Sequence, residues 1–329
     1  MKKANFTIFF ALMLTLILST AAAAAELIPG GMTVGLELKV RGVMVSRLLE
    51  VDTHDGKVSP AGEAGIRPGD CIVSLAGAEI QCGEDFTRRA AGLDGDTVSL
   101  TLRRDGQERT LSITPAQNKS GVWQLGMLLR DGAAGIGTVT YYDPVSGQFG
   151  ALGHGVNDMD SGLLLPAEQG LVSPSVVVDI IPGKAGTPGE LCGIFDSGET
   201  LGAIDSNTAF GIFGTLERFP GGDMVLETAE AGQVQPGKAT ILSNIKGTSV
   251  EEYEIELTRV NCSAKDGKCF VLKITDERLL KQTGGVICGM SGSPILQNGR
   301  LIGAVTHVLV NDPTRGYGIF IDKMLEAAA

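Results

Sequence analysis

The chain consists mainly of short runs in which apolar and polar residues alternate. Residues 34–40 alternate in this way, and residues 43–51 form a second such run. Both are predicted to be half-buried strands. Residues 98–103 and 108–113 alternate on either side of an Asp-Gly dipeptide at residues 105–106. Because Asp-Gly is typical of tight hairpin turns, we predict a β-hairpin there.

Helical periodicity is rare along the chain. A short helix is predicted just before the Pro-Gly turn at residues 68–69, a second over residues 86–91, and a third over residues 322–328. The chain has 46 glycines and only 5% aromatic residues. This combination favours many short strands joined by tight turns, because Gly readily adopts the positive φ that such turns need.

From residue 122 to the end, short apolar runs recur between glycines without long helical periodicity. These runs cover residues 135–142, 176–181, 240–245, 254–260, 269–274 and 301–310. Many short strands spaced by turns predict a β-barrel or β-sandwich.

Two folded units are expected from the chain length. The 329 residues suffice for two domains of about 150 residues each. A polar stretch at residues 116–121 separates a first unit, residues 30–115, from a second, residues 122–329. No internal repeat is apparent.

The first 25 residues have the pattern of a leader. Lys2 and Lys3 precede an apolar run over residues 6–18, and alanines follow over residues 21–25. We expect either a cleaved signal peptide or an uncleaved membrane anchor over residues 1–25. In both cases the mature protein lies outside the cytoplasm, and in the second it is associated with the membrane.

Charge and metal-ligating residues exclude some classes of function. The formal net charge is −11 and there is no long basic stretch, so nucleic acid is not an expected partner. The six cysteines include no Cys-x-x-Cys pair, and the three histidines are far apart in the sequence. The sequence therefore predicts no metal site, and nothing in it calls for a cofactor.

The first unit resembles a PDZ domain. The resemblance is carried by Ala-Gly-Ile-Arg-Pro-Gly-Asp-Cys-Ile at residues 64–72. PDZ domains bind the extended end of a peptide as an added strand at a sheet edge. The resemblance implies that the backbone of a loop holds the terminal carboxylate, and that loop is expected at Gly31, Met32, Thr33, Val34 and Gly35. The alternative is a spacer domain that binds no peptide.

A candidate nucleophile lies in Gly-Met-Ser-Gly-Ser-Pro at residues 289–294. A nucleophilic Ser needs an exposed hydroxyl on a tight turn, with N–H groups directed at the developing oxyanion. The segment resembles that of chymotrypsin-like peptidases, with Ser291 as nucleophile and the N–H groups of Gly289 and Ser291 as oxyanion hole. By the same resemblance, Thr306 and His307 border the substrate cleft. The alternative is a Gly-Ser turn in an inert β-protein.

A general base must accompany the serine. His54 lies in the PDZ-like unit, whereas His154 stands between two glycines after a predicted strand. We therefore prefer His154 as the base and keep His307 as the alternative. For the carboxylate that orients the base, the residues alone do not decide. The candidates are Asp158, Asp160, Asp196, Asp205 and Asp276.

The second unit resembles the stage IV sporulation protein B peptidases. The matching segments are residues 130–138, 150–154, 188–191, 284–294 and 304–314. The resemblance implies a mainly β fold, a small α+β PDZ domain followed by a chymotrypsin-like double β-barrel. It also implies a catalytic triad of His154, Asp276 and Ser291. Asp276 lies only 15 residues before Ser291, which departs from the spacing in chymotrypsin-like enzymes.

The resemblance implies an exported serine endopeptidase that cleaves itself. It also implies cleavage of a membrane-bound regulator in the space between mother cell and forespore, after which an intramembrane protease activates a late sporulation sigma factor. The expected partners are protein substrates and, through the PDZ domain, peptide termini. Two alternatives are a PDZ-bearing adaptor with an inactive peptidase domain and a quality-control protease of the HtrA type. The latter usually carries its PDZ domain after the protease.

Overall fold

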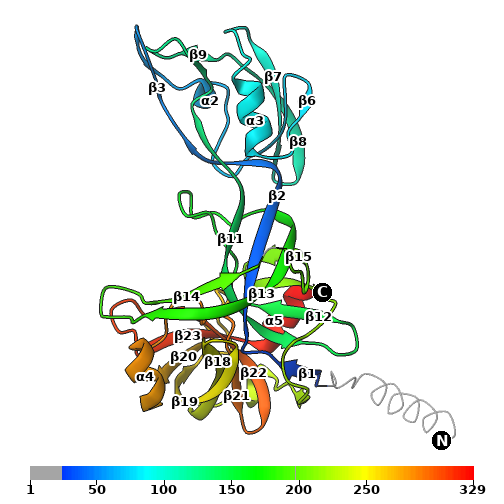
Figure 1. Cartoon of the computed structure of the whole chain (residues 1–329), viewed down its shortest axis with the longest axis vertical. Helices are drawn as coiled ribbons and strands as arrows, with labels where there is room; N and C mark the ends of the chain where they lie inside the picture. The colour runs from blue at the N-terminus through cyan, green and yellow to red at the C-terminus, as the bar shows by residue number, and fades with distance from the viewer. Residues whose placement is uncertain (1–23, 197) are drawn as a thin grey trace, which may run out of the picture.

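The computed structural model describes residues 24–196 and 198–329. Figure 1 shows a smaller upper body and a larger lower body, joined by the long strands β2 (Thr33–Leu48) and β11 (Met127–Tyr142). The leader predicted over residues 1–25 lies almost entirely outside the described residues. No helix within the described part of the chain is long and apolar enough to cross a membrane.

One half of the larger body is a closed ring of six antiparallel strands, which we call barrel 1. Besides β2 and β11, it contains β12 (Gln148–Ala151), β13 (Ala167–Ile181), β15 (Gly202–Thr208) and β16 (Gly211–Leu216). Pairing runs in the order β2–β11–β12–β16–β15–β13 and returns to β2. Alternate residues of β2, such as Val34, Leu36 and Leu38, point into its core. The strand predicted over residues 34–40 therefore exists, and it belongs to barrel 1.

The other half is a second closed barrel, which we call barrel 2. Its strands are β18 (Gly237–Lys246), β19 (Ser249–Val260), β20 (Phe270–Ile274), β21 (Pro294–Gln297), β22 (Arg300–Val308) and β23 (Arg315–Phe320). They pair in the order β18–β19–β20–β23–β22–β21. Helix α4 (Glu277–Thr283) follows β20, and α5 (Ile321–Ala328) ends the chain. Four of the six apolar runs predicted as strands in the second unit form β18, β19, β20 and β22 of this barrel.

The two barrels have the same topology. Numbered along the chain, the six strands of each follow the ring order 1–2–3–6–5–4. This arrangement confirms the predicted mainly β, chymotrypsin-like double barrel. Shorter elements attached to the barrels are β1 (Glu26–Pro29), β14 (Glu190–Phe195), β17 (Leu226–Glu227) and the 3₁₀ turn η1 (Ala231–Gln233).

The upper body is the PDZ domain. Its elements are β3 (Val51–Thr53), β4 (Gly56–Val58), α2 (Pro60–Glu63), β5 (Cys71–Leu75), β6 (Ala78–Glu79), α3 (Gly83–Ala90), β7 (Val98–Arg104), β8 (Gln107–Ile113), β9 (Ala116–Gln117) and β10 (Trp123–Gln124). The predicted hairpin is β7–β8, with Asp105 and Gly106 at φ values of 52° and 75°. The helix predicted over residues 86–91 is α3. Phe86 of α3 lies in the apolar core with Ile72 and Leu100.

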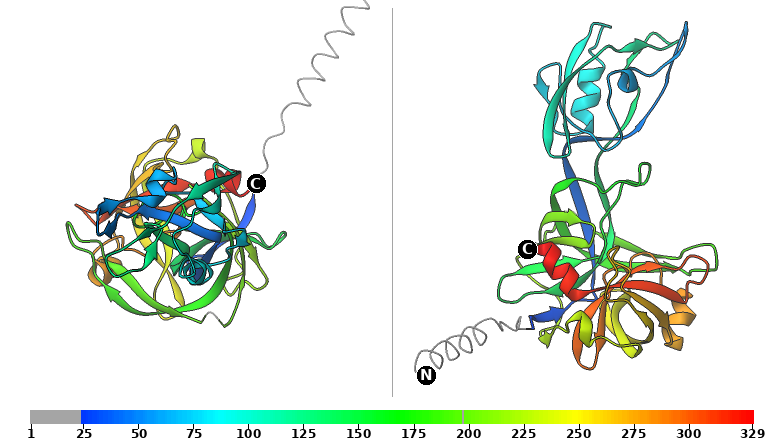
Figure 2. Two further views of the ribbon diagram at one scale, coloured as in Figure 1. Left: turned by 90° about the horizontal axis from the view of Figure 1, so that it is seen from above. Right: turned by 180° about the vertical axis from the view of Figure 1, so that it is seen from behind.

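The PDZ domain is inserted into barrel 1 between its first two strands. The chain leaves the barrel along β2, whose end pairs with β5 in the PDZ sheet, and returns along β11. Figures 1 and 2 both show these two strands as the stem between the bodies. Gly42 has φ +86°, and a Cβ there would lie 2.2 Å from Ile72 O. Gly42 therefore lets β2 change direction as it enters the PDZ sheet.

Candidate active site

Ser291 lies between α4 and β21, on the side of barrel 2 that faces barrel 1. Gly289 and Gly292 flank its turn with φ values of +94° and +96°. A Cβ on Gly292 would lie 2.1 Å from Thr138 O of β11, so only glycine fits without displacing barrel 1. Ser291 is half-buried, and its Oγ donates to Thr306 O at 2.6 Å.

The backbone around Ser291 is held by the two threonines of β11. Thr138 Oγ1 donates to Gly289 O at 2.7 Å, and Thr140 Oγ1 donates to Gly292 O at 2.8 Å. The amide of Thr138 also donates to Ser291 O. The amides of Gly289 and Ser291 donate no hydrogen bond to any described residue. Two amides of a fixed turn are therefore available where the sequence predicts the oxyanion hole.

His154 follows β12 of barrel 1, and its ring meets that of His307 from β22. The ring centroids are 4.7 Å apart and the planes are tilted by 36°. His154 Nδ1 lies 2.8 Å from Gly155 O, a contact in which Nδ1–H donates and Nε2 remains unprotonated. Burial lowers the pKa of His154, against the effect of the Gly155 carbonyl. An unprotonated Nε2 is the form that a general base requires.

His307 lies beside His154. Partial burial of its ring lowers its pKa to about 4, and repulsion from Lys268 and from His154 in its protonated form adds to this shift. Thr306 contributes its carbonyl to Ser291, whereas its own Oγ1 is buried and has no hydrogen-bond partner among the described residues. Both residues predicted for the cleft thus lie around Ser291 and His154.

Asp276 is not among the groups that His154 contacts. It is the N-cap of α4, and its carboxylate accepts from the amides of Arg278 and Leu279. It also forms an ion pair with Arg278 at 2.9 Å and accepts a weak bond from Glu254 N. These donors hold the pKa of Asp276 below its usual range, in spite of burial. The structure therefore brings His154 and Ser291 to one interface but directs Asp276 to a helix end and a cation.

Among the described residues, none of the other carboxylates considered from the sequence forms a hydrogen bond with His154. Asp158 and Asp160 bind Arg130 of the stem. Asp196 and Asp205 are exposed. Within the described residues, the polar group at His154 Nδ1 is the neighbouring peptide carbonyl rather than a carboxylate.

The loop predicted to hold a peptide carboxylate, Gly31, Met32, Thr33, Val34 and Gly35, is corrected by the structure. All five residues are buried in the lower body. Gly31 N donates to Val139 O, and Met32 O accepts from Val139 N. The side chain of Phe195 fills the space beside Gly35. Because the strand pairs with β11 and β13, its backbone is engaged in barrel 1 and does not form an open sheet edge.

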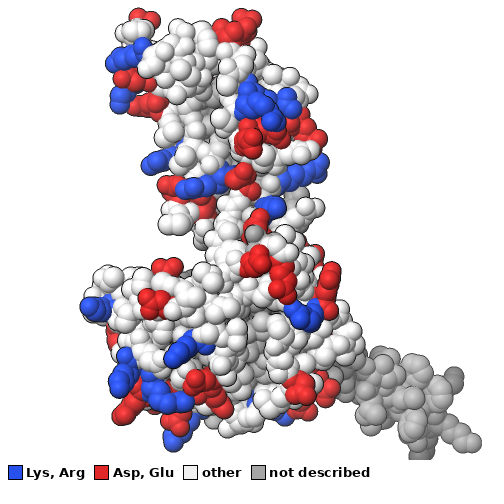
Figure 3. Space-filling model, in the orientation of Figure 1, with Lys and Arg blue, Asp and Glu red and all other residues white. Residues whose placement is uncertain are grey.

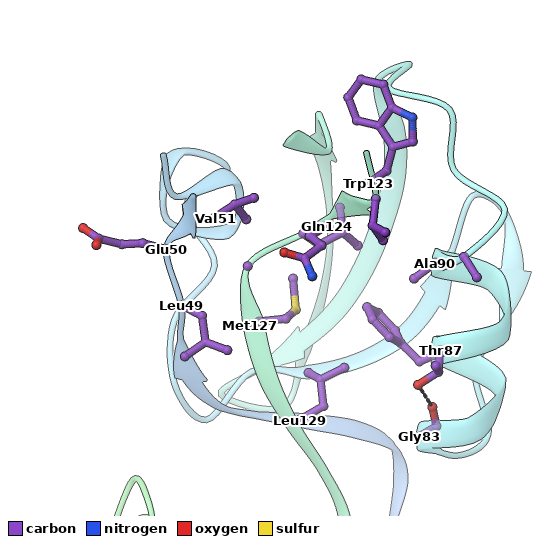
Figure 4. Close-up of a pocket in the computed structure, with 15 residues that line it drawn as sticks. Leu49, Glu50, Val51, Gly83, Thr87, Ala90, Trp123, Gln124, Met127 and Leu129 are labelled. Carbon is purple, nitrogen blue, oxygen red and sulfur yellow. Dashed lines mark hydrogen bonds between the residues drawn. The ribbon is translucent and has the colours of Figure 1, made fainter. Parts of the chain in front are cut away.

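An open strand edge exists instead within the PDZ domain. One edge of β11 at residues 127–130 pairs with β2. The opposite edge is unpaired among the described strands and faces α3 across a groove of about 540 Å³. Figure 4 shows Met127 and Leu129 on one wall and Thr87 and Ala90 on the other. A strand edge beside a helix is the geometry in which PDZ domains add a peptide as an extra strand.

A turn suited to a peptide carboxylate precedes this edge, at Leu125-Gly126-Met127. Gly126 has φ +72°, and a Cβ there would lie 2.5 Å from Leu49 O. Between described residues, neither Leu125 N nor Gly126 N donates a hydrogen bond. The sequence analysis does not predict this site, although the sequence carries a signal for it, an apolar-Gly-apolar triplet before an alternating run. The pairing of β11 with β2 distinguishes it from residues 31–35.

The fold and the site define a class: a two-barrel serine peptidase with an inserted PDZ domain. The family model of the SpoIVB peptidase S55 family matches residues 121–325, and that of the PDZ domain matches residues 32–114. The chain belongs to the SpoIVB peptidase S55 family. The resemblance found in the sequence is thereby confirmed, as is the assignment to the serine peptidases.

Shorter similarities connect the chain with other proteins. A protein of Mesorhizobium japonicum named as a zinc metalloprotease is 44% identical over 57 residues, which is 17% of this chain and 16% of that protein. One of Clostridium perfringens with the same kind of name is 35% identical over 69 residues, 21% of each. The chain thus spans about a fifth of these relatives. A crystal structure of Rv3671c from M. tuberculosis, an inactive serine-to-alanine mutant, gives a TM-score of 0.30 with 14% identity, covering 59% of this chain and 81% of that one.

Proposed function

We propose that this peptidase cleaves proteins internally through an acyl-enzyme formed on Ser291, with His154 as its general base. The observation that carries the proposal is the Ser291 turn, with two amides that donate to no described residue, at the same interface as His154. His154 Nε2 accepts the Ser291 proton, and the amides of Gly289 and Ser291 stabilise the oxyanion. In the resting arrangement the hydroxyl donates to Thr306 O, so it must rotate toward His154 when substrate binds.

We further propose that Gly155 O, rather than Asp276, orients the base. The Gly155 carbonyl lies within hydrogen-bond distance of His154 Nδ1, whereas the oxygens of Asp276 are shared among α4, Arg278 and Glu254. A carbonyl acceptor selects the Nδ1–H tautomer as a carboxylate would. It lacks the negative charge that would stabilise the imidazolium.

The proposed biological role is in sporulation signalling outside the cytoplasm. The enzyme is proposed to cleave itself and a membrane-bound regulator in the space between mother cell and forespore, so that an intramembrane protease activates a late sigma factor. Membership of the SpoIVB peptidase S55 family and the leader predicted over residues 1–25 support this role. The groove between α3 and β11 is proposed to bind the carboxyl end of a protein chain.

The interspersed surface charge agrees with protein partners. On the face shown in Figure 3, Lys and Arg alternate with Asp and Glu over both bodies and do not gather into one basic patch. Counterion release from nucleic acid depends on such clusters of positive charge. Peptide recognition through a groove and a strand edge does not require them.

The test compares two serines of the same turn. Ser291→Ala is expected to abolish labelling by a fluorophosphonate and to lower kcat by roughly 10⁴-fold or more. Ser293→Ala is the control, because the buried Ser293 Oγ bonds to Ser243 Oγ at 3.1 Å and is not exposed to substrate. Mass spectrometry of the mature N-terminus in the same variants tests self-cleavage. Full labelling of Ser291→Ala would exclude Ser291 as the nucleophile.

A further inference from the structure

The segment that follows His154 reaches from the active site to the PDZ domain. We call residues 155–165 the base loop. Its two ends are held together on barrel 1 by Asn207 at the end of β15. Asn207 Oδ1 accepts from Val156 N at 2.9 Å, and its Nδ2 donates to Val156 O and Leu165 O at 2.9 and 2.8 Å.

The middle of the base loop is anchored by a buried carboxylate. Asp158 is 6% exposed. It accepts from Ser46 Oγ at 2.5 Å and from both N and Oγ of Ser161 at 2.8 Å. Arg130 Nε lies 3.4 Å from its other oxygen, and Arg130 also forms an ion pair with Asp160 at 2.7 Å. A buried carboxylate is tolerated only where such donors surround it, so these contacts specify the position of the loop.

The donors of this anchor come from the two strands that carry the PDZ domain. Ser46 stands on β2 beyond the point where β2 pairs with the PDZ strand β5, and Arg130 stands on β11 directly after Leu129 of the peptide groove. An additional contact joins the loop to the PDZ domain, because a Cβ on Gly69 would lie 2.9 Å from Leu163 Cδ1. The base loop therefore packs on the PDZ domain as well as on barrel 1.

The same loop supplies the acceptor for the catalytic imidazole. Gly155, its first residue, presents the carbonyl that lies 2.8 Å from His154 Nδ1. A Cβ on Gly155 would lie 2.3 Å from Leu164 Cδ1 and 2.5 Å from Thr208 O, so the start of the loop fits closely between its own end and β15. A displacement of the loop would move Gly155 O and, with it, the ring that this carbonyl orients.

We propose that Asp158 is a positioning residue through which the PDZ-bearing stem holds the base loop, and thereby His154, in its catalytic orientation. The inference rests on the proposed function of His154 as the general base. It assigns to the PDZ domain a contribution to the chemical step that is separate from any peptide it binds. It also gives a role to Asp158 and Asp160, which the sequence had left as candidates for the orienting carboxylate.

The experiment uses the full chain and three variants that weaken the anchor: Asp158→Asn, Ser46→Ala and Arg130→Gln. The rate of fluorophosphonate labelling at Ser291 is measured at 25 °C. Asp158→Asn is expected to lower this rate by roughly 10–100-fold, because a displacement of about 1 Å of a catalytic group has effects of that order. Ser46→Ala and Arg130→Gln each remove one donor and should produce smaller losses. They also preserve the test if Asp158→Asn fails to fold.

Lys119→Ala is the matched control, because Lys119 forms an ion pair with Asp52 on the exposed PDZ surface at 2.9 Å. Hydrogen exchange of residues 152–156 is measured in the same proteins and does not depend on activity. Faster exchange there together with slower labelling supports the proposal. If the anchor variants lose thermal stability but keep the labelling rate and the exchange of residues 152–156, Asp158 has only a structural role and the proposal is overturned. If the wild type itself is not labelled, the proposed function fails, and the exchange data still decide the anchor.

Discussion

The two barrels share one strand order, yet they hold their catalytic residues by different means. Barrel 2 carries Ser291 in a turn whose carbonyls accept hydrogen bonds from Thr138 and Thr140 of barrel 1. Barrel 1 carries His154 directly before the base loop, which is held by side chains. Asn207 binds the ends of the loop on barrel 1, and Asp158 binds its middle to the stem. The nucleophile is thus positioned by the barrel interface, whereas the base depends on a loop that also contacts the PDZ stem.

This difference indicates which half of the site can vary. At Gly292, a positive φ and the close approach of the Thr138 backbone leave no room for a side chain, so other residues are excluded there. A loop held by a few polar side chains can move when one of them is lost. We therefore expect changes at the Ser291 turn to be severe and changes around the base loop to be graded.

The largest effect is expected from Gly292→Ala. A Cβ there would lie 2.1 Å from Thr138 O and 2.6 Å from Leu152 N, at a φ of +96°. The clash with fixed backbone should destabilise the fold by several kcal/mol and abolish labelling of Ser291. Gly162→Ala is the control, because Gly162 also has positive φ, +69°, but nothing lies within 4 Å of its Cβ position. Equal midpoints in urea unfolding for the two variants would contradict the rigid-turn interpretation.

A smaller effect separates the two possible roles of Asp276. If Asp276 caps α4, Asp276→Asn loses the charge that pairs with Arg278 and should lower the free energy of unfolding by about 1–2 kcal/mol, with kcat within a few-fold of wild type. If it belongs to a triad, the same change should lower kcat by about 10⁴-fold. Asp266→Asn is the control, since within the described part of the chain Asp266 accepts a hydrogen bond only from Lys268 N, in an exposed turn. Urea unfolding and steady-state kinetics together distinguish these outcomes.

Much of the lower body could be predicted from the sequence, because its signals are local. Short apolar runs between glycines predict β18, β19, β20 and β22 of barrel 2. The Gly-Met-Ser-Gly-Ser-Pro segment predicts the nucleophile turn. The shared topology of the two barrels could not be predicted, since it depends on which strands pair and leaves no visible repeat in the sequence. Residues 34–40 looked like the first PDZ strand for the same reason, because their pairing with β11 connects residues far apart in the chain.

The site shows the same limit. His154 was found because glycines surround it, but its acceptor, Gly155 O, is a backbone atom and has no signature in residue types. The peptide groove was assigned to residues 31–35, although Leu125-Gly126-Met127 has the better local pattern. The choice between them depends on which strand has an open edge beside α3, and this is a property of the assembled sheet.

The smallest effect is expected from a change of pH, and it tests the half of the site that holds the general base. His307 has a folded pKa of about 4, below its unfolded value of about 6.5. The unfolded state therefore binds more protons between these two values, so the contribution of His307 to stability is complete above about pH 6.5 and is lost as pH falls toward 4. His154, with its pKa also lowered by burial, acts in the same direction. Urea unfolding at a series of pH values should show less dependence on pH in His307→Gln than in the wild type, while His54→Gln, a change on the exposed PDZ surface, should follow the wild type.

The labelling rate of Ser291 should rise with pH through an inflection below 6.5, because His154 must be neutral to accept a proton. A labelling rate that stays constant from about pH 8 down to the pH at which the protein unfolds would contradict the role of His154 as the base and leave the Ser291 turn as the only supported half of the site.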